Sequence, residues 1–126
     1  MKCAVAIDLG SEVIAEIMQA WLPDEWRPHV AAVGHNRFGD VVGMVRDVQP
    51  ALLIIHSNLL IAAPEGAIAA CAAVSPSTRY LIMTAWQQEH IEALHKSYEA
   101  LHIAIQTLRM PFNREQLNAA VKAALA

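Results

Sequence analysis

The sequence predicts one α/β domain over residues 1–126, with five parallel strands covered by helices on both faces. Short aliphatic runs alternate with stretches whose apolar residues recur at helical spacing, the pattern of strands joined by crossover helices. Residues 52–55 and 81–83 are continuously apolar, as in strands buried on both sides. The chain has 126 residues and is 56% hydrophobic, which is enough to form one core without disulfides or metals.

The aliphatic runs are the expected strands. Each is short, rich in β-branched or aliphatic residues, and bounded by polar residues, glycine or proline. They cover residues 3–8, 29–34, 51–56, 80–84 and 102–108.

Two amphipathic helices are expected between the first three strands. The first has Ser11 as its N-cap and ends at Pro23, and the second ends before Pro50. Apolar residues at helical spacing mark the first helix at Val13, Ile14, Ile17, Met18 and Trp21. The same spacing marks the second at Phe38, Val41, Val42, Val45 and Val48.

Three further helices complete the alternation. The third, residues 65–74, is almost all alanine, so it can lie close against the sheet. The fourth is more polar, and the fifth starts from Asn113 as its N-cap. Their apolar positions are Ile91, Leu94, Tyr98 and Leu101 in the fourth helix, and Leu117, Val121 and Leu125 in the fifth.

Charge and composition exclude several classes of function. Nine basic against twelve acidic residues give a net charge of −3, which argues against binding to nucleic acid or to an anionic membrane. Asp8 interrupts the N-terminal apolar run before a signal-peptide core can form, and no apolar stretch is long enough to span a bilayer. Cys3 and Cys71 are interpreted as small buried residues. We therefore expect a cytoplasmic domain.

Ligands of such sheets bind outside the carboxyl ends of the strands, near the point where the strand order reverses. The residues expected there are Asp8, Gly34, His56, Thr84 and the stretch 109–112. These positions are the candidates for a functional site.

Several of these segments resemble the receiver domain of bacterial two-component response regulators, the CheY-like family. Residues 50–56 read Pro-Ala-Leu-Leu-Ile-Ile-His, residues 80–85 read Tyr-Leu-Ile-Met-Thr-Ala, and residues 108–112 read Leu-Arg-Met-Pro-Phe. Leu117 follows the third segment, and Asp8-Leu9 matches the end of the family's first strand. The resemblance covers the whole chain and implies one receiver-like domain with the flavodoxin-like strand order 2-1-3-4-5.

The resemblance implies an altered phosphorylation site. A working receiver holds Mg²⁺ with an acidic pair and an acceptor Asp, while a Thr or Ser and a Lys bind the phosphoryl group. Here Asp8 is followed by Leu9, His56 stands at the acceptor position, and Met110 stands at the Lys position; Thr84 is kept. One carboxylate should hold Mg²⁺ poorly, so we expect aspartyl phosphorylation to be lost. No catalytic residue, cofactor or enzyme activity is expected.

The signalling switch is altered as well. The family couples the Thr to an aromatic residue three positions before the Lys, and here that residue is Thr107. The resemblance thus implies an atypical receiver that acts by contact with a protein partner. It also implies homodimers through the fourth helix, fifth strand and fifth helix, and a cis bond between Met110 and Pro111. The candidate interface residues are Trp86, His90, His95, Tyr98 and Arg109.

Other interpretations of His56 stay open. The imidazole would bond Asp8, Thr84 or Ser57 at the strand end, and pairing with Asp8 would raise its pKa. Alternatively, Asp8, His56 and Thr84 would bind a metal or a small anion, and imidazole favours Zn²⁺, Cu²⁺ or Ni²⁺. Phosphoryl acceptance on the imidazole ranks last. The sequence does not identify the partner, the pathway or an upstream kinase.

Overall fold

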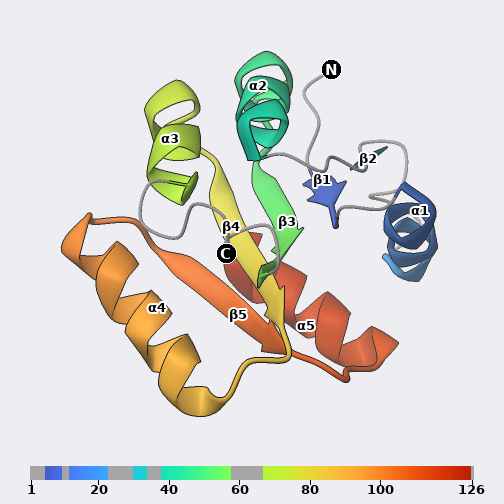
Figure 1. The fold of residues 1–126 in the computed structure, drawn as a ribbon. Coiled ribbons are helices and arrows are strands. Elements are labelled where there is room, and N and C mark those ends of the chain that lie inside the picture. The colour runs from blue at the N-terminus through green and yellow to red at the C-terminus, as the bar shows by residue number, and fades with distance from the viewer. Residues whose placement is uncertain (1–4, 10–11, 23–29, 34–37, 58–66, 126) are drawn as a thin grey trace.

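The computed structural model describes residues 5–9, 12–22, 30–33, 38–57 and 67–125. Strands and helices alternate through this part of the chain, as the sequence predicts (Figure 1). The strands are β1 (Val5–Asp8), β2 (Val30–Val33), β3 (Leu52–His56), β4 (Arg79–Thr84) and β5 (Ile105–Arg109). The helices are α1 (Glu12–Trp21), α2 (Phe38–Val48), α3 (Ala67–Val74), α4 (Gln88–Ala100) and α5 (Arg114–Leu125).

The strands form one parallel sheet, in the order β2-β1-β3-β4-β5. The predicted class, an α/β fold with a parallel sheet and covering helices, is confirmed. None of the described helices combines the length and the apolar character needed to cross a bilayer.

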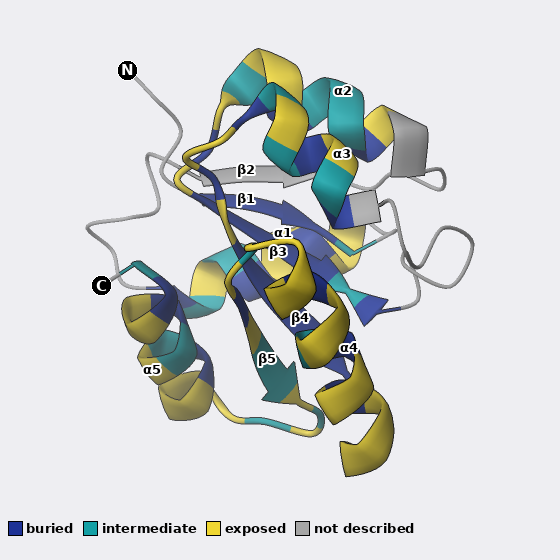
Figure 2. Cartoon of the chain, turned by 90° about the vertical axis from the view of Figure 1, so that its left-hand side faces the viewer, coloured by how far each residue is buried: buried dark blue, intermediate teal, exposed yellow. Residues whose placement is uncertain are grey.

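Two hydrophobic cores lie on opposite faces of the sheet, because successive strand residues point to opposite sides. On one face Ala6, Leu53 and Ile82 pack with residues of α2, α3 and α4; we call this the α2–α4 core. On the other face Ile7 and Ile54 pack with residues of α1 and α5; we call this the α1–α5 core. Figure 2 shows the central strands buried between these helical layers.

Helix α1 exists as predicted, but only Met18 and Trp21 of the predicted stripe pack against the core. Ala15, Met18 and Leu22 are buried, at spacings of three and four residues. Val13, Ile14 and Ile17, which mark the helix in the sequence, are 66%, 52% and 55% exposed. The helix is apolar on nearly every side, so its periodicity predicts a helix without deciding which side is buried.

Two helix ends follow the sequence signals. Helix α2 stops at Val48, before Pro50, and Gln49 takes a left-handed backbone with φ 51°. The Asn113 side-chain oxygen accepts the Gln116 N–H at 2.8 Å, while the Gln116 side chain accepts the Asn113 N–H at 2.9 Å. This reciprocal capping box confirms Asn113 as the N-cap of α5.

Some predicted boundaries shift. Strand β5 begins at Ile105 rather than at His102, which has a left-handed φ of 59° and therefore breaks the extended chain. Leu101 is 49% exposed beyond the end of α4 instead of packing in the core. Cys71 is buried as expected, and burial raises the pKa of its thiol to about 12. The predicted positions outside the described residues are Cys3, Ser11, Pro23, Gly34 and residue 65.

Candidate functional site

The strand register determines which side chains meet at the carboxyl edge of the sheet. Asp8 at the end of β1 is level with Ile55 of β3, so His56 lies one position farther along. His56 is in turn level with Met83 of β4, and Thr84 is level with Arg109 of β5. The candidate residues therefore end their strands at staggered levels.

Because successive strand residues point to opposite sides, Asp8, His56 and Thr84 do not all start from the same face of the sheet. Asp8 follows Ala6 by two residues, and Thr84 follows Ile82 by two, so both belong to the side of the α2–α4 core. His56 follows Ile54 by two residues and belongs to the side of the α1–α5 core. Asp8 and Thr84 thus start from one face of the sheet and His56 from the other, and all three stand at the carboxyl ends of their strands.

Thr84 closes the turn that leads into α4. Its side chain is fully buried, and its hydroxyl oxygen accepts the Trp86 N–H at 2.9 Å. Its carbonyl accepts the Met110 N–H at 2.8 Å. The retained threonine thus ties the loops after β4 and β5 to each other.

His56 is half-buried, and burial lowers the pKa of its imidazole below the ordinary value of 6.5. The direction follows because burial disfavours the charged form. The rise expected from pairing with the Asp8 carboxylate is therefore wrong. Lowering the pKa keeps the imidazole neutral near pH 7.

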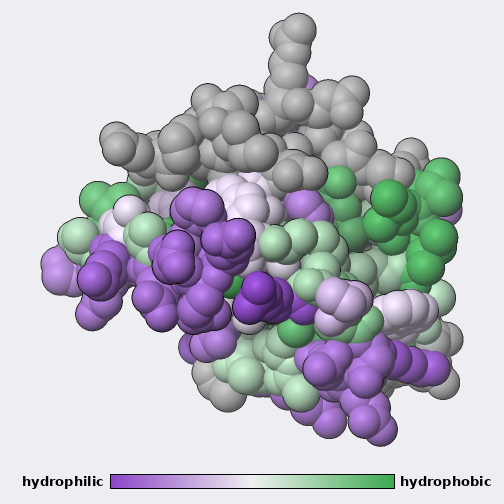
Figure 3. Space-filling view, turned by 60° about the horizontal axis from the view of Figure 1, so that its bottom comes forward, coloured by the Kyte–Doolittle hydropathy of each residue, from purple (hydrophilic) through white to green (hydrophobic). Residues whose placement is uncertain are grey.

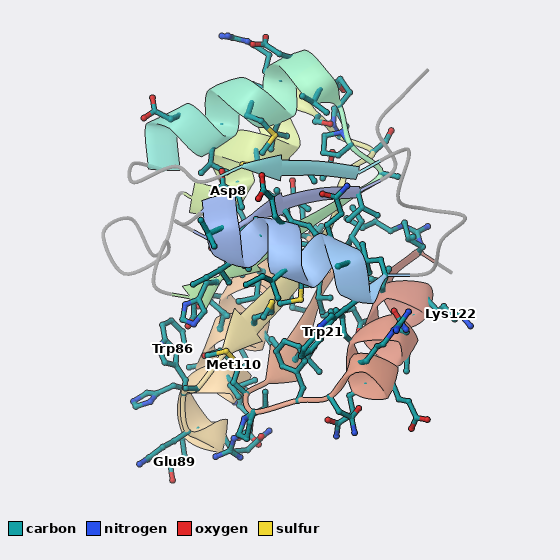
Figure 4. All side chains as sticks on the ribbon, turned by 90° about the vertical axis from the view of Figure 1, so that its right-hand side faces the viewer. Asp8, Trp21, Trp86, Glu89, Met110 and Lys122 are labelled. Atoms are coloured by element: carbon teal, nitrogen blue, oxygen red, sulfur yellow. The ribbon has the colours of Figure 1, made fainter. Side chains whose placement is uncertain are left out.

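Met110 is joined to Pro111 by a cis peptide bond, as expected. Its side chain packs at the margin of the α1–α5 core, together with Leu9 and Phe112. Asp8 and Met110 lie on different sides of α1 in Figure 4, and strands β3 and β4 separate β1 from β5 in the sheet. At the position where the family has a lysine, this chain thus places an apolar thioether against apolar neighbours.

The arrangement of these side chains does not support the metal-binding interpretation. Within the described ranges, no group of three His, Cys, Asp or Glu side chains is placed to hold a metal ion. Asp8 and His56 would need at least one more ligand to make a strong site. At the carboxyl edge of the sheet, the described residues present the buried Asp8 carboxylate, the neutral His56 imidazole, the Thr84 hydroxyl and the Met110 thioether.

Thr107, the switch position, is held by α4. Its hydroxyl and the His95 Nε2 are 3.2 Å apart and form a hydrogen bond between β5 and α4. His95, predicted as an interface residue, thus makes an inward contact that the sequence did not predict. His95 follows buried Ile91 by four residues, so helical spacing could have placed it at the margin of the buried face.

Tyr98 is not an interface residue. It is fully buried and belongs to the α2–α4 core, and burial raises the pKa of its phenol. The same spacing that predicts Ile91 and Leu94 as the inner side of α4 places Tyr98 with them. Its assignment to an interface is wrong.

The other interface candidates surround the start of α4 and the end of β5. Trp86 is half-buried, packs against the α2–α4 core, and meets the His90 ring edge-on at 6.4 Å. It therefore covers the core at the start of α4. His90 and Arg109 are exposed, as an interface requires. Much of α4 faces solvent in Figure 2, and only Ile91, Leu94 and Tyr98 are buried.

An apolar groove of about 510 Å³ lies beside Met110, between α1 and the segments that follow β4 and β5. At one end, the rings of Trp21 and Phe112 meet edge-on with centroids 6.2 Å apart. Sequence patterns do not predict this groove, because its walls come from segments far apart along the chain. The lining residues are Ile14, Ile17, Met18, Trp21, Met83, Ala85, Met110, Pro111 and Phe112.

Solved structures of signal receiver domains share this fold over most of their length. A signal receiver domain of an HD domain-containing protein from Pseudomonas fluorescens Pf-5 is 17% identical, with a TM-score of 0.72, 99% of this chain covered and 95% of that one. The chemotaxis protein CheY4 of Vibrio cholerae is 14% identical, with a TM-score of 0.74, 99% of this chain covered and 100% of that one.

A protein assigned to pilus assembly in Burkholderia pseudomallei K96243 is also similar. It is 17% identical with a TM-score of 0.74, and the match covers 97% of this chain and 88% of that one. The sequence matches no protein-family model and no curated protein. At such low identities the similarity shows the fold, that of CheY-like receiver domains.

Proposed function

We propose that this chain is an atypical receiver module of bacterial two-component signalling, cytoplasmic and non-enzymatic, which acts by contact with a protein partner without being phosphorylated. The fold supports the receiver assignment. The single observation that carries the rest is Met110, whose thioether packs among apolar residues where the family has its lysine.

The chemistry of phosphoryl transfer explains why this substitution matters. Catalysis of that step rests on positioning and on charges that compensate the phosphoryl oxygens. Mg²⁺ takes oxygen ligands and releases its waters reluctantly, so a site needs several carboxylates to hold it. Asp8 is one carboxylate, and Leu9 and His56 stand where the family has the others.

The contact between Thr107 and His95 supports a signalling mode without phosphate. In the family an aromatic ring at this position moves between buried and exposed states. Thr107 is too small for that movement and is bonded to α4 instead. We infer that α4 is held in one position and that protein partners bind it in that position.

The partner surface that the resemblance implies is the α4–β5–α5 face, used for a protein partner and for a second copy. Its described outer residues are mostly polar, and His90 and Arg109 are exposed on it. Polar faces suit transient contacts rather than permanent ones. The alternative function, a metal- or anion-binding domain, is not favoured, because the described edge lacks a third ligand.

The test is incubation with acetyl phosphate and Mg²⁺ followed by intact-mass measurement. We expect no added phosphoryl group on the wild-type chain. The matched variant Leu9→Asp/His56→Asp/Met110→Lys restores the acids and the ammonium and is expected to gain that mass. A stable phosphoryl group on the wild-type protein would refute the proposal.

A further inference from the structure

The outer side of α1 carries three of the four large hydrophobic side chains that are exposed in the described part of the chain, and the proposed function leaves it unused. Val13, Ile14 and Ile17 project from it with 66%, 52% and 55% of their surface exposed, and we call them the α1 ridge. Figure 3 shows a strongly hydrophobic patch at the right-hand edge of the described surface, over this helix. Fractions of this size on three aliphatic residues expose on the order of 300 Å², as much as the largest apolar patch of many monomers.

The groove beside the ridge continues the same surface. Ile14 and Ile17 belong to both, and the far wall is formed by Met83, Met110 and Phe112. Every lining residue is apolar, so no side chain there would neutralise a charged group of a ligand. Its volume of about 510 Å³ is enough for several aliphatic side chains and is typical of binding pockets.

Ridge and groove are complementary in chemistry. The groove needs uncharged aliphatic side chains, and the ridge supplies them at the spacing of a helix. A symmetric dimer uses the same patch on both subunits, so that patch must fit itself. A surface with an apolar ridge next to an apolar groove meets this requirement.

We propose that α1 and the groove beside it form a homodimer interface, in which the ridge of each copy enters the groove of the other. Such a contact covers both apolar features of each copy at once. A specific interface buries roughly 800 Å² per partner, a little over half of it apolar, so a ridge that exposes on the order of 300 Å² would supply most of that apolar share.

This interface is distinct from the α4–β5–α5 face. Helix α1 covers the opposite side of the sheet from α4, as Figure 1 shows. A dimer formed through α1 would therefore leave α4 accessible to another protein. The inference goes beyond the proposed function and does not depend on it.

The test is sedimentation velocity of the full chain over a range of concentrations. We expect a concentration-dependent dimer, with Ile17→Glu raising its dissociation constant at least tenfold, because the carboxylate would enter an apolar groove. Ala73→Glu is the matched control: Ala73 is exposed on α3, away from α1 and from the α4–β5–α5 face, so this variant should dimerise like the wild type. Leu101→Glu, at a residue 49% exposed near the end of α4, would instead weaken dimers formed through the α4–β5–α5 face.

Two further measurements make the result specific. Mixing Ile17→Glu with Ile17→Lys should restore dimers, because each charge would then meet its opposite across the two-fold axis. If circular dichroism shows that Ile17→Glu does not fold, Val13→Glu takes its place, because Val13 is the most exposed residue of the ridge. Two outcomes would overturn the inference: a wild-type chain that stays monomeric throughout, or dimers weakened by Leu101→Glu and unaffected by Ile17→Glu.

Discussion

Replacing Thr107 by valine is expected to loosen α4 from the sheet. The variant keeps the branched shape of the side chain and removes the hydroxyl that bonds His95 Nε2 at 3.2 Å. Helix α4 buries only Ile91, Leu94 and Tyr98, so one hydrogen bond is a substantial part of its attachment. The effect should therefore appear in α4 before it appears elsewhere.

The magnitude follows from the geometry. The bond is partly buried, and its length is near the long end of the usual range. A bond of this kind contributes about 0.5–1 kcal/mol, since the His95 imidazole is half-buried and regains water when the hydroxyl is lost. Thr107→Val should lower the free energy of unfolding by that amount.

The assay is a double-mutant cycle in urea with Thr107→Val, His95→Gln and the double variant. We expect a coupling energy of about 0.5 kcal/mol between the two positions, as for groups in direct contact. Hydrogen exchange should show faster opening of α4 amides in Thr107→Val, with α5 unchanged. A coupling energy indistinguishable from zero would show that this bond does not hold α4.

Two other predictions concern the site edge and the last helix. Burial holds the pKa of folded His56 below 6.5, so as pH falls through 6.5 the unfolded chain takes up the proton first. The free energy of unfolding should therefore fall between pH 7.5 and pH 5.5, and urea titrations should show a smaller fall in His56→Gln. Asn113→Ala should cost about 1 kcal/mol through loss of the capping box, whereas Asn113→Asp should keep most of that stability; equal urea midpoints for the two variants would contradict this explanation.

The sequence predicted the fold because its signals agree with one another. Continuous apolar runs mark the central strands, and Pro50 and Asn113 mark helix ends through backbone chemistry that acts locally. The inner side of α1 could not be predicted in this way. Ala15 and Ile17 are both apolar, so the choice between them depends on how the helix lies on the sheet, which local spacing does not contain.

The positions of the candidate site were predicted from the sequence, but the face of the sheet from which each side chain starts was not. The structure places Asp8, His56 and Thr84 at the ends of β1, β3 and β4, and Met110 directly after β5. Which face each side chain occupies depends on strand register, and a shift of one residue reverses it. Register is fixed by pairing between strands far apart in the chain, so the sequence alone could not assign each of these side chains to a face.

The altered site and the α1 surface meet at Met110. This residue both stands at the lysine position and forms part of the groove wall with Pro111 and Phe112. An ammonium at this point would break the apolar wall opposite Ile14 and would resist burial under another protein. Under the proposed function, Met110 lacks the charge that would bind a phosphoryl group, and in the structure it forms part of an apolar groove wall. A receiver that had exchanged phosphate control for constitutive contact would gain from both effects, which is why the phosphorylation test and the Ile17→Glu test bear on one residue from two sides.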